Sequence, residues 1–316
     1  MVVQRFFAAV LCAALSSTSW GACKILQAGE LAVSIENNRV VTNGELLGEP
    51  VHLLIDTGAS ISFIWESVAR RLRLPVSDLE AESVLGHEAG STLVKQLKVG
   101  AYPADGVRLR VVYDSRGSQL AAYPLVLGWD FFSIFTTEFD LAHGKIRLLK
   151  PKDCQPEDLP YWTKSYSLAQ LERNQEFTWP MRTEVRLNGR AMDAILDTGA
   201  RISLVGRAAA ARAGVRASTD TGVSGSTQEP RRLSGRFDTF TIGDETIHDV
   251  TLVMADLFPW AKVPSGSHIM RVPDEAPSML IGCDFFLSHR IIVVPDKRKL
   301  IFTYNGGPVF QVVQPE

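Results

Sequence analysis

The feature that most constrains this chain is a short stretch that occurs twice. Residues 53–60 read LLIDTGAS and residues 194–201 read AILDTGAR, so each copy is an apolar run that ends in Asp-Thr-Gly-Ala. Such a run is typical of a buried strand. Because burying an unpaired charge is costly, the aspartate at its end needs donors, which a threonine hydroxyl and a glycine N–H can supply. The two copies predict that Asp56 and Asp197 are brought face to face.

The similarity between the two halves extends beyond this motif. At the same offset of 141 positions, three further pairs are identical: Gly48 with Gly189, Ile61 with Ile202, and Ser62 with Ser203. A second motif is repeated at an offset of 154, since residues 127–132 read LGWDFF and residues 281–286 read IGCDFF. Two motifs repeated in the same order indicate a duplicated domain.

The length of the chain agrees with duplication. A chain of 316 residues with 46% hydrophobic residues is long enough for two domains, each with its own core. The formal net charge of −2 gives no indication of a nucleic acid or an anionic membrane as partner. We expect four segments: a signal peptide at 1–21, a first lobe at 22–150, a connection rich in proline and charge at 151–178, and a second lobe at 179–316. A short helix is expected within the connection, near residues 168–173.

The N-terminus has the order of a secretory signal peptide. Arg5 provides the positive charge, residues 6–15 form an apolar run too short to span a bilayer, and small residues precede Ala22. A buried N-terminal helix is the alternative interpretation. The signal predicts export to the periplasm or the extracellular space, with a lipid anchor at Cys23 as the second interpretation and no transmembrane helix later in the chain.

Removal of the signal leaves three cysteines. Cys23 and Cys154 stand at the two ends of the first half and could form a disulfide, which an exported protein can keep. Cys283 lies in an apolar motif and is expected to be a buried free thiol. The histidines are scattered and no metal-binding spacing is present, so we expect neither a metal nor a cofactor.

Other elements are expected on either side of the repeated motifs. Residues 65–74 and 206–215 have the spacing and termination of helices. Residues 84–93 and 222–227 contain glycines and are expected to form two hairpins. Candidate residues at the tips of these hairpins are Gly86, His87, Gly222 and Ser224.

These motifs resemble those of the aspartic peptidases of the pepsin and retropepsin superfamily. The resemblance rests on Asp-Thr-Gly-Ala in each half, the apolar strand before it and the later hydrophobic-Gly element, and it covers roughly residues 31–302. It implies a mostly β fold with two homologous pepsin/retropepsin-like β-barrel lobes, pseudo-two-fold symmetry and an active cleft between the lobes. The likeness is closer to retropepsins, but both lobes lie in one chain here, which implies a monomer.

The resemblance also implies roles for individual residues. Asp56 and Asp197 are expected to share one proton and to activate a water molecule that hydrolyses a peptide bond in an extended peptide or protein substrate. The supporting residues are Thr57 and Thr198, which bond across the axis, Gly58 and Gly199, which point N–H groups at the carboxylates, and Gly128 and Gly282, which allow close packing. The two hairpins are expected to be flaps that close over the substrate.

Arg201 departs from the family pattern, since the matching position in the first half is Ser60, a small polar residue of the kind usual there. Three roles are open for this arginine: it favours ionised carboxylates, it binds an acidic group of the substrate, or it pairs with an acidic neighbour such as Asp193 or Glu184. The alternative function for the whole chain is a catalytically inactive protein that keeps the fold and binds peptides or proteins.

Overall fold

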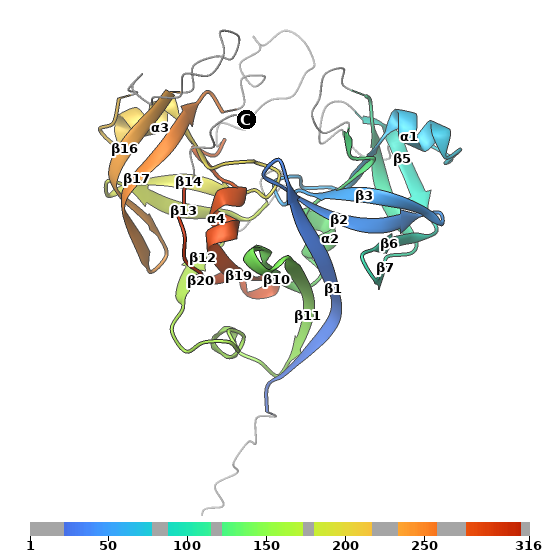
Figure 1. Cartoon of the computed structure of the whole chain (residues 1–316), viewed down its shortest axis with the longest axis horizontal. Coiled ribbons are helices and arrows are strands. Elements are labelled where there is room, and N and C mark those ends of the chain that lie inside the picture. The colour runs from blue at the N-terminus through green and yellow to red at the C-terminus, as the bar shows by residue number, and fades with distance from the viewer. Residues whose placement is uncertain are drawn as a thin grey trace, which may run out of the picture.

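The computed structural model describes residues 22–77, 88–114, 122–172, 180–216, 233–257 and 276–310. These residues are mostly strands, and they form two lobes that stand side by side above a shared sheet (Figure 1). The predicted signal peptide at 1–21 lies outside the described residues. No helix in the described ranges is both long and apolar enough to cross a bilayer.

The first lobe is built around one buried strand. Its elements are β1 (Lys24–Glu36), β2 (Arg39–Leu46), β3 (Glu49–Ile55), β4 (Phe63–Trp65), α1 (Glu66–Arg71), β5 (Glu88–Val94), β6 (Leu97–Val99), β7 (Tyr102–Pro103), β8 (Val107–Val112), β9 (Leu125–Leu127) and α2 (Trp129–Phe132). Strand β3 pairs antiparallel with β2 and parallel with β9. Because it has a neighbour on each side and its last three residues are fully buried, it reads as a continuous apolar run rather than an alternating one.

The second lobe repeats this arrangement as a closed barrel with the strand order β13-β14-β18-β15-β17-β16. Its elements are β13 (Arg182–Leu187), β14 (Arg190–Leu196), β15 (Leu204–Gly206), α3 (Arg207–Arg212), β16 (Leu233–Ile242), β17 (Glu245–Ala255), β18 (Met279–Ile281) and α4 (Cys283–Ser288). Strands β3 and β14, strands β4 and β15, and helices α1 and α3 stand 141 positions apart, which is the offset of the repeated motif. The duplication expected from the sequence is therefore present in the fold.

The helices expected after each loop are present but short. Helix α1 ends at Arg71 and α3 ends at Arg212, because the chain turns through positive φ soon afterwards, at Arg73 (φ 53°) and Gly214 (φ 82°). Both helices follow directly on the strand that leaves the aspartate loop.

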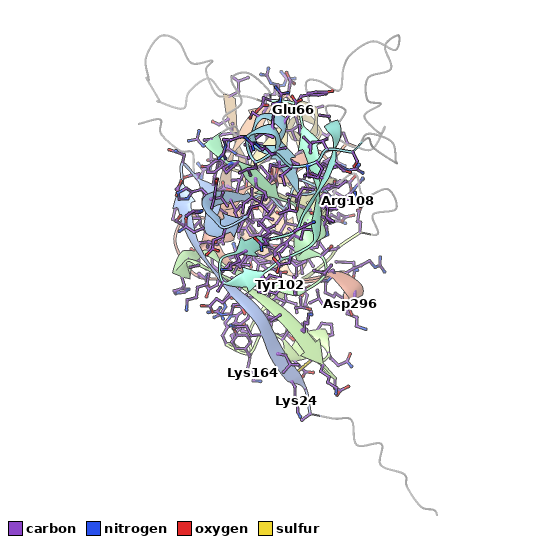
Figure 2. All side chains as sticks on the ribbon, turned by 90° about the vertical axis from the view of Figure 1, so that its right-hand side faces the viewer. Lys24, Glu66, Tyr102, Arg108, Lys164 and Asp296 are labelled. Atoms are coloured by element: carbon purple, nitrogen blue, oxygen red, sulfur yellow. A yellow bond between two sulfur atoms is a disulfide. The ribbon has the colours of Figure 1, made fainter. Side chains whose placement is uncertain are left out.

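A sheet beneath both lobes joins the two halves. It runs in the order β12-β20-β19-β10-β11-β1, where β10 is Thr136–Asp140, β11 is Lys145–Lys152, β12 is Ser167–Gln170, β19 is His289–Val294 and β20 is Lys299–Tyr304. Strand β10 of the first half pairs antiparallel with β19 of the second half. In Figure 2 β1 runs down from the lobe that carries Glu66 to Lys24, so this strand belongs to both the lobe and the lower sheet.

The prediction of a helix near residues 168–173 is wrong. Residues Ser167–Gln170 form β12, which pairs antiparallel with β20 so that Leu168 faces Ile301 in the register. The edge of β20 offers unpaired backbone groups, and their pairing outweighs the local helix preference of this segment.

The disulfide that the sequence left open is present. Cys23 and Cys154 are bonded across a sequence separation of 131 residues, and they tie the start of β1 to the segment that follows β11. Cys283 is a buried free thiol, as predicted, and burial raises the pKa of this thiol to about 12. Such a thiol stays protonated and unreactive at neutral pH.

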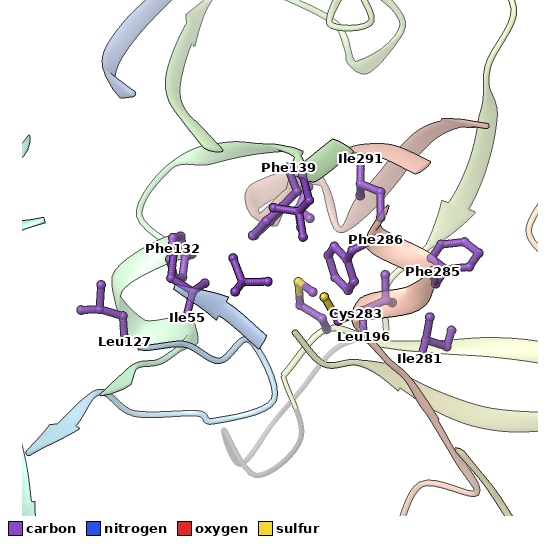
Figure 3. Packing of buried hydrophobic residues seen from close by; sticks show 14 of the residues in the cluster. Ile55, Leu127, Phe132, Phe139, Leu196, Ile281, Cys283, Phe285, Phe286 and Ile291 are labelled. Atoms are coloured by element: carbon purple, nitrogen blue, oxygen red, sulfur yellow. The ribbon is translucent and has the colours of Figure 1, made fainter. Parts of the chain in front are cut away.

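Aromatic side chains fill the core between the halves. Phe139 of the first half meets Phe286 of the second with ring centroids 5.4 Å apart in an edge-to-face arrangement. Figure 3 shows Phe132 to one side of this pair and Cys283 beneath it, near Ile55 and Leu196, the last residues of the strands that lead to Asp56 and Asp197. The core therefore supports the two aspartate loops from below.

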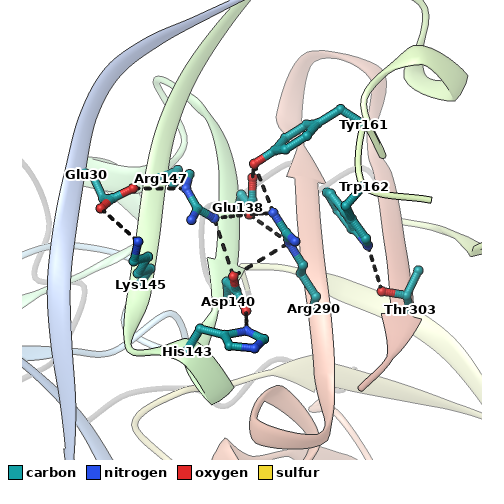
Figure 4. A network of polar contacts seen from close by, with 10 residues as sticks. All are labelled: Glu30, Glu138, Asp140, His143, Lys145, Arg147, Tyr161, Trp162, Arg290 and Thr303. Atoms are coloured by element: carbon teal, nitrogen blue, oxygen red, sulfur yellow. Dashed lines mark hydrogen bonds and ion pairs between the residues drawn. The ribbon is translucent and has the colours of Figure 1, made fainter. Parts of the chain in front are cut away.

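A cluster of buried charges also joins the halves, and we call it the inter-lobe ion cluster (Figure 4). Glu138 is fully buried and bonds Arg147 of β11 and Arg290 of β19, the latter with a guanidinium–carboxylate distance of 2.7 Å. The Arg290 guanidinium also stacks 3.9 Å from the centre of the Trp162 ring. Because each buried charge has a partner, the cluster fixes β10 against β19 without an uncompensated charge.

Candidate active site

Each aspartate stands immediately after a buried strand. β3 ends at Ile55 and β14 ends at Leu196, so Asp56 and Asp197 are the first residues of the loops that follow. The Asp56 N–H donates to the Leu127 carbonyl at 2.9 Å, and the Asp197 N–H donates to the Ile281 carbonyl at 2.8 Å. The parallel partners β9 and β18 therefore hold the backbone of the two aspartates in the same way.

The loops then curl so that their N–H groups face the carboxylates. Oδ1 of Asp56 accepts hydrogen bonds from the N–H groups of Gly58 at 3.0 Å and Ala59 at 3.1 Å. Oδ1 of Asp197 accepts from Gly199 at 2.8 Å and Ala200 at 3.1 Å. One oxygen of each carboxyl group is thus held by backbone donors, as the resemblance implied.

The two carboxyl groups meet across the pseudo-two-fold axis. They lie close enough that each carboxyl group shifts the pKa of the other. A Cβ placed on Gly58 would lie 2.4 Å from Cγ of Asp197, and a Cβ on Gly199 would lie 2.4 Å from Cγ of Asp56. No side chain fits at either glycine, so the motif needs glycine there to let the opposite carboxyl group approach.

Thr57 and Thr198 lock the two loops together. The N–H of each threonine donates to the hydroxyl of the other at 3.0 Å. Each hydroxyl in turn donates to a backbone carbonyl of the opposite lobe, Thr57 to Leu196 at 3.0 Å and Thr198 to Ile55 at 2.8 Å. Both threonines are fully buried, and these four bonds fix the distance between the aspartates.

The surroundings favour one shared proton on this pair. Burial raises the pKa of Asp197 well above its ordinary value, and the neighbouring Asp56 charge raises it further. Burial also raises the pKa of Asp56, although hydrogen bonds from Asp197, Ala59 and Gly58 act in the opposite direction. Two carboxylates in contact cannot both ionise at low cost, and the pair titrates as a unit. Both residues keep part of their surface exposed, although the carboxyl groups themselves are largely surrounded by protein.

A second pair of polar residues supports each loop from behind, and the sequence analysis gave these residues no role. In the first lobe the Ser62 hydroxyl donates to Asp130 Oδ1 at 2.6 Å and accepts from the Gly128 N–H at 2.9 Å. The signal was available, because Ser62 and Asp130 both belong to repeated motifs.

The second lobe has the same arrangement. The Ser203 hydroxyl donates to Asp284 Oδ1 at 2.6 Å and accepts from the Gly282 N–H at 2.9 Å. In each lobe this bridge ties the segment after the aspartate loop to the short helix that begins within the second motif.

Gly128 and Gly282 lie directly behind the loops. A Cβ on Gly128 would meet the Ala59 carbonyl oxygen at 2.7 Å, and one on Gly282 would meet the Ile202 carbonyl carbon at 2.4 Å. The backbone leaves no space for a side chain, so the close packing that the resemblance implied is present.

Arg39 is a further residue near the pair that sequence reasoning missed. It is the first residue of β2, and its guanidinium donates to the Gly199 carbonyl of the opposite lobe at 3.1 Å. The charge of Arg39 also acts on the Asp56 carboxyl group. No motif marks this arginine, and the residue it bonds is 160 positions away in the sequence.

The acidic partners suggested for Arg201 bind other arginines. Asp193 pairs with Arg182 at 2.5 Å, and Glu184 pairs with Arg186 at 2.6 Å. Within the described ranges no ion pair joins Arg201 to either carboxylate, so that interpretation was wrong. Ser60, at the matching position, accepts a backbone hydrogen bond from Asp130 at 3.3 Å.

The four candidate flap residues, Gly86, His87, Gly222 and Ser224, lie outside the described residues. In the part of the chain that is described, no group of three or more His, Cys, Asp or Glu side chains could hold a metal ion.

Comparison with known proteins shows the family of the chain. The aspartyl protease family matches residues 41–131 and 183–285, and each match contains one Asp-Thr-Gly-Ala loop and most of one copy of the second motif. The chain has the two-lobed fold of the pepsin- and retropepsin-like aspartic peptidases. Because the two matches cover more than half of the sequence, the chain belongs to the aspartyl protease family.

Among solved structures, the chain is similar to an aspartic proteinase from Irpex lacteus, with 12% sequence identity and a TM-score of 0.49. The similarity covers 87% of this chain and 97% of that one. No curated protein matches.

Proposed function

We propose that the protein is an exported aspartic endopeptidase in which Asp56 and Asp197 form the catalytic dyad. The observation that carries the proposal is the contact between the two carboxyl groups, each held by two backbone N–H donors from its own loop and faced by the glycine of the other loop. This arrangement needs one proton between the two groups and leaves both residues partly exposed.

The dyad performs hydrolysis through acid–base catalysis. The ionised carboxylate takes a proton from a water molecule, and the water oxygen bonds the carbonyl carbon of the peptide. The protonated carboxyl group donates its proton to the carbonyl oxygen, which gives a neutral tetrahedral intermediate. The bond from carbon to nitrogen then breaks. The carboxyl group that took the water proton gives it to the leaving amine, and a hydroxyl of the intermediate returns its proton to the other carboxylate as the new carbonyl forms. Water is the nucleophile, so no covalent intermediate with the protein forms.

The proposed substrate class rests on the match to the aspartyl protease family. We expect a peptide or an unfolded protein segment that lies extended across the dyad, with the hairpins around Gly86, His87, Gly222 and Ser224 as flaps. Because one chain supplies both halves of the dyad, the protein is expected to work as a monomer. Light scattering coupled to size exclusion tests this, and an obligate dimer would contradict it.

Export is supported by the signal-like N-terminus and by the disulfide between Cys23 and Cys154, which persists in oxidising compartments. We propose that residues 1–21 are removed and that two lobes, 22–150 and 179–316, follow around the connection at 151–178. Mass spectrometry of the exported protein tests the cleavage site. A mature chain that begins at Ala22 agrees with the proposal. A lipid-modified Cys23 would instead indicate a protein that is anchored to a membrane through this cysteine.

The activity is tested by incubating the mature chain with a denatured protein mixture from mildly acidic to neutral pH. Asp56→Asn and Asp197→Asn each remove one carboxyl group, and Asp296→Asn, an exposed site on another part of the chain, is the matched control. We expect cleavage by the control and by the unsubstituted protein, and none by the dyad variants. Cleavage that persists in both dyad variants would refute the mechanism. Binding of peptides without any cleavage would favour an inactive binding protein.

A further inference from the structure

The two aspartate loops are nearly identical, but the charges around them are not. We infer that Arg39 breaks the symmetry of the dyad and makes Asp56 the ionised base and Asp197 the carboxyl group that carries the proton. This inference rests on the proposed peptidase function and assigns the two chemical roles within it.

The geometry places Arg39 on the Asp56 side of the pair. Its guanidinium is anchored on the Gly199 carbonyl at 3.1 Å. Gly199 is the residue that packs against Asp56, since a Cβ on this glycine would lie 2.4 Å from Cγ of Asp56. The anchor therefore holds a positive charge beside the residue that touches the Asp56 carboxyl group.

In the described part of the second lobe, the position that matches Arg39 carries no cation. The position 141 residues after Arg39 is Pro180, a buried residue without charge. The backbone donors do not supply the asymmetry instead, because Asp56 and Asp197 each accept from two N–H groups at 2.8–3.1 Å. The threonine bonds are also symmetric. Arg201 also distinguishes the two loops, because it takes the position of Ser60, but Arg39 is the cation that acts on a carboxyl group of the dyad in the described residues.

The electrostatics agree with this geometry. A nearby cation favours the ionised form of a carboxyl group. Burial raises the pKa of Asp56, and Arg39 is among the groups that oppose this rise. For Asp197 the neighbouring Asp56 charge adds to burial, and both raise the pKa. Within the described ranges, Asp197 and Arg39 are the titratable and charged groups that act on Asp56, and Asp56 is the one that acts on Asp197.

The roles in hydrolysis follow from this assignment. Asp56 accepts the proton of the attacking water, and Asp197 donates its proton to the carbonyl oxygen of the peptide. Arg39 contacts neither water nor substrate in this scheme, so it is a positioning residue that acts through Gly199 and Asp56.

The test is the pH profile of kcat/KM for a peptide substrate, which reports the ionisation of the free enzyme. Arg39→Met removes the charge, Arg39→Lys keeps it, and Arg190→Met is the control at an exposed arginine that begins β14. Loss of the cation raises the pKa of Asp56, so we expect the acidic limb of Arg39→Met to move to higher pH by about 0.5–1 unit. Arg39→Lys keeps the charge, so its acidic limb is expected to stay close to that of the unsubstituted protein. The control Arg190→Met is expected to show no shift.

An acidic limb that stays in place in a folded Arg39→Met protein would overturn the inference. A parallel loss of activity at every pH would also overturn it, because that result indicates a purely structural contact. If Arg39→Met does not fold, Arg39→Gln keeps a donor for the Gly199 carbonyl without the charge, and the same shift is expected.

A second readout does not depend on activity. The ¹³C chemical shift of the Asp56 carboxyl group is followed against pH in the unsubstituted protein and in Arg39→Met. A midpoint that rises in the variant supports the role of Arg39, and an unchanged midpoint overturns it. If the unsubstituted protein cleaves nothing, the proposed peptidase function fails, while this titration still decides whether Arg39 sets the ionisation of Asp56.

Discussion

Thr198→Val tests how the two halves are held at the dyad. The substitution keeps the shape of the side chain and removes its hydroxyl, which accepts from the Thr57 N–H at 3.0 Å and donates to the Ile55 carbonyl at 2.8 Å. All three residues are fully buried, so water cannot replace the lost partner without opening the structure.

The expected cost can be worked from these two bonds. A buried N–H left without an acceptor costs about 1–3 kcal/mol, and the loss of the second hydrogen bond costs about 1 kcal/mol. We therefore expect Thr198→Val to lower the free energy of unfolding by about 2–4 kcal/mol. Thr198→Ser keeps the hydroxyl and loses one methyl group, and its expected cost is about 1 kcal/mol.

The assay is urea unfolding followed by circular dichroism, with Thr241→Val as a control. Thr241 shares its hydroxyl with Thr246 at the surface of the second lobe, so its loss is expected to change the free energy of unfolding by less than about 0.5 kcal/mol. Thr57→Val is expected to match Thr198→Val, since its bonds are equivalent. The double variant is expected to cost less than the sum of the two, because neighbouring sites couple. The reasoning is refuted if Thr198→Val is no more destabilising than Thr198→Ser.

Three further predictions concern Gly199, the disulfide and the ionisation of Asp197. Gly199→Ala places a methyl group 2.4 Å from Cγ of Asp56, so we expect kcat/KM to fall at least about 100-fold, whereas Gly189→Ala, in an open turn, leaves it nearly unchanged. Cys23→Ser opens the link across 131 residues, and chemical unfolding is expected to show a loss of about 3 kcal/mol; no difference from the oxidised protein would contradict this. The pKa of Asp197 is raised on folding, so its contribution to stability is present below the unfolded value, near 3.8, and is lost as the pH rises through the folded value. Asp197→Asn is therefore expected to flatten the decline of Tm above about pH 4 and to raise Tm at pH 7, and an unchanged decline would count against the raised pKa.

The repeated motifs were sufficient to predict the pair and its immediate supports. Asp56 and Asp197 sit in a loop whose donors come from its own next residues, so a local pattern defines the geometry. The cross-axis bonds of Thr57 and Thr198 were accessible through the family resemblance, because both threonines are part of the motif.

Other features depend on contacts that no local pattern encodes. Segment Ser167–Gln170 has no strong strand signal. It becomes a strand because it pairs with the edge of β20, which lies about 130 residues later in the sequence. Arg39 lies before the first motif in a strand with no signature, and its position matters only because the opposite loop presents the Gly199 carbonyl to it. The inter-lobe ion cluster likewise needs Glu138 and Arg290, which are 152 positions apart, to meet on paired strands.

The central claim is that two aspartates share one catalytic task, and the most direct test is kcat/KM for a single peptide substrate at the pH optimum. Asp56→Asn, Asp197→Asn and the double variant are compared with the unsubstituted protein after circular dichroism has shown that each is folded. Because the dyad acts as a unit, we expect each single variant to lose at least about 1,000-fold and the double variant to lose little more. A single variant that keeps kcat/KM within about tenfold of the unsubstituted protein would contradict the account.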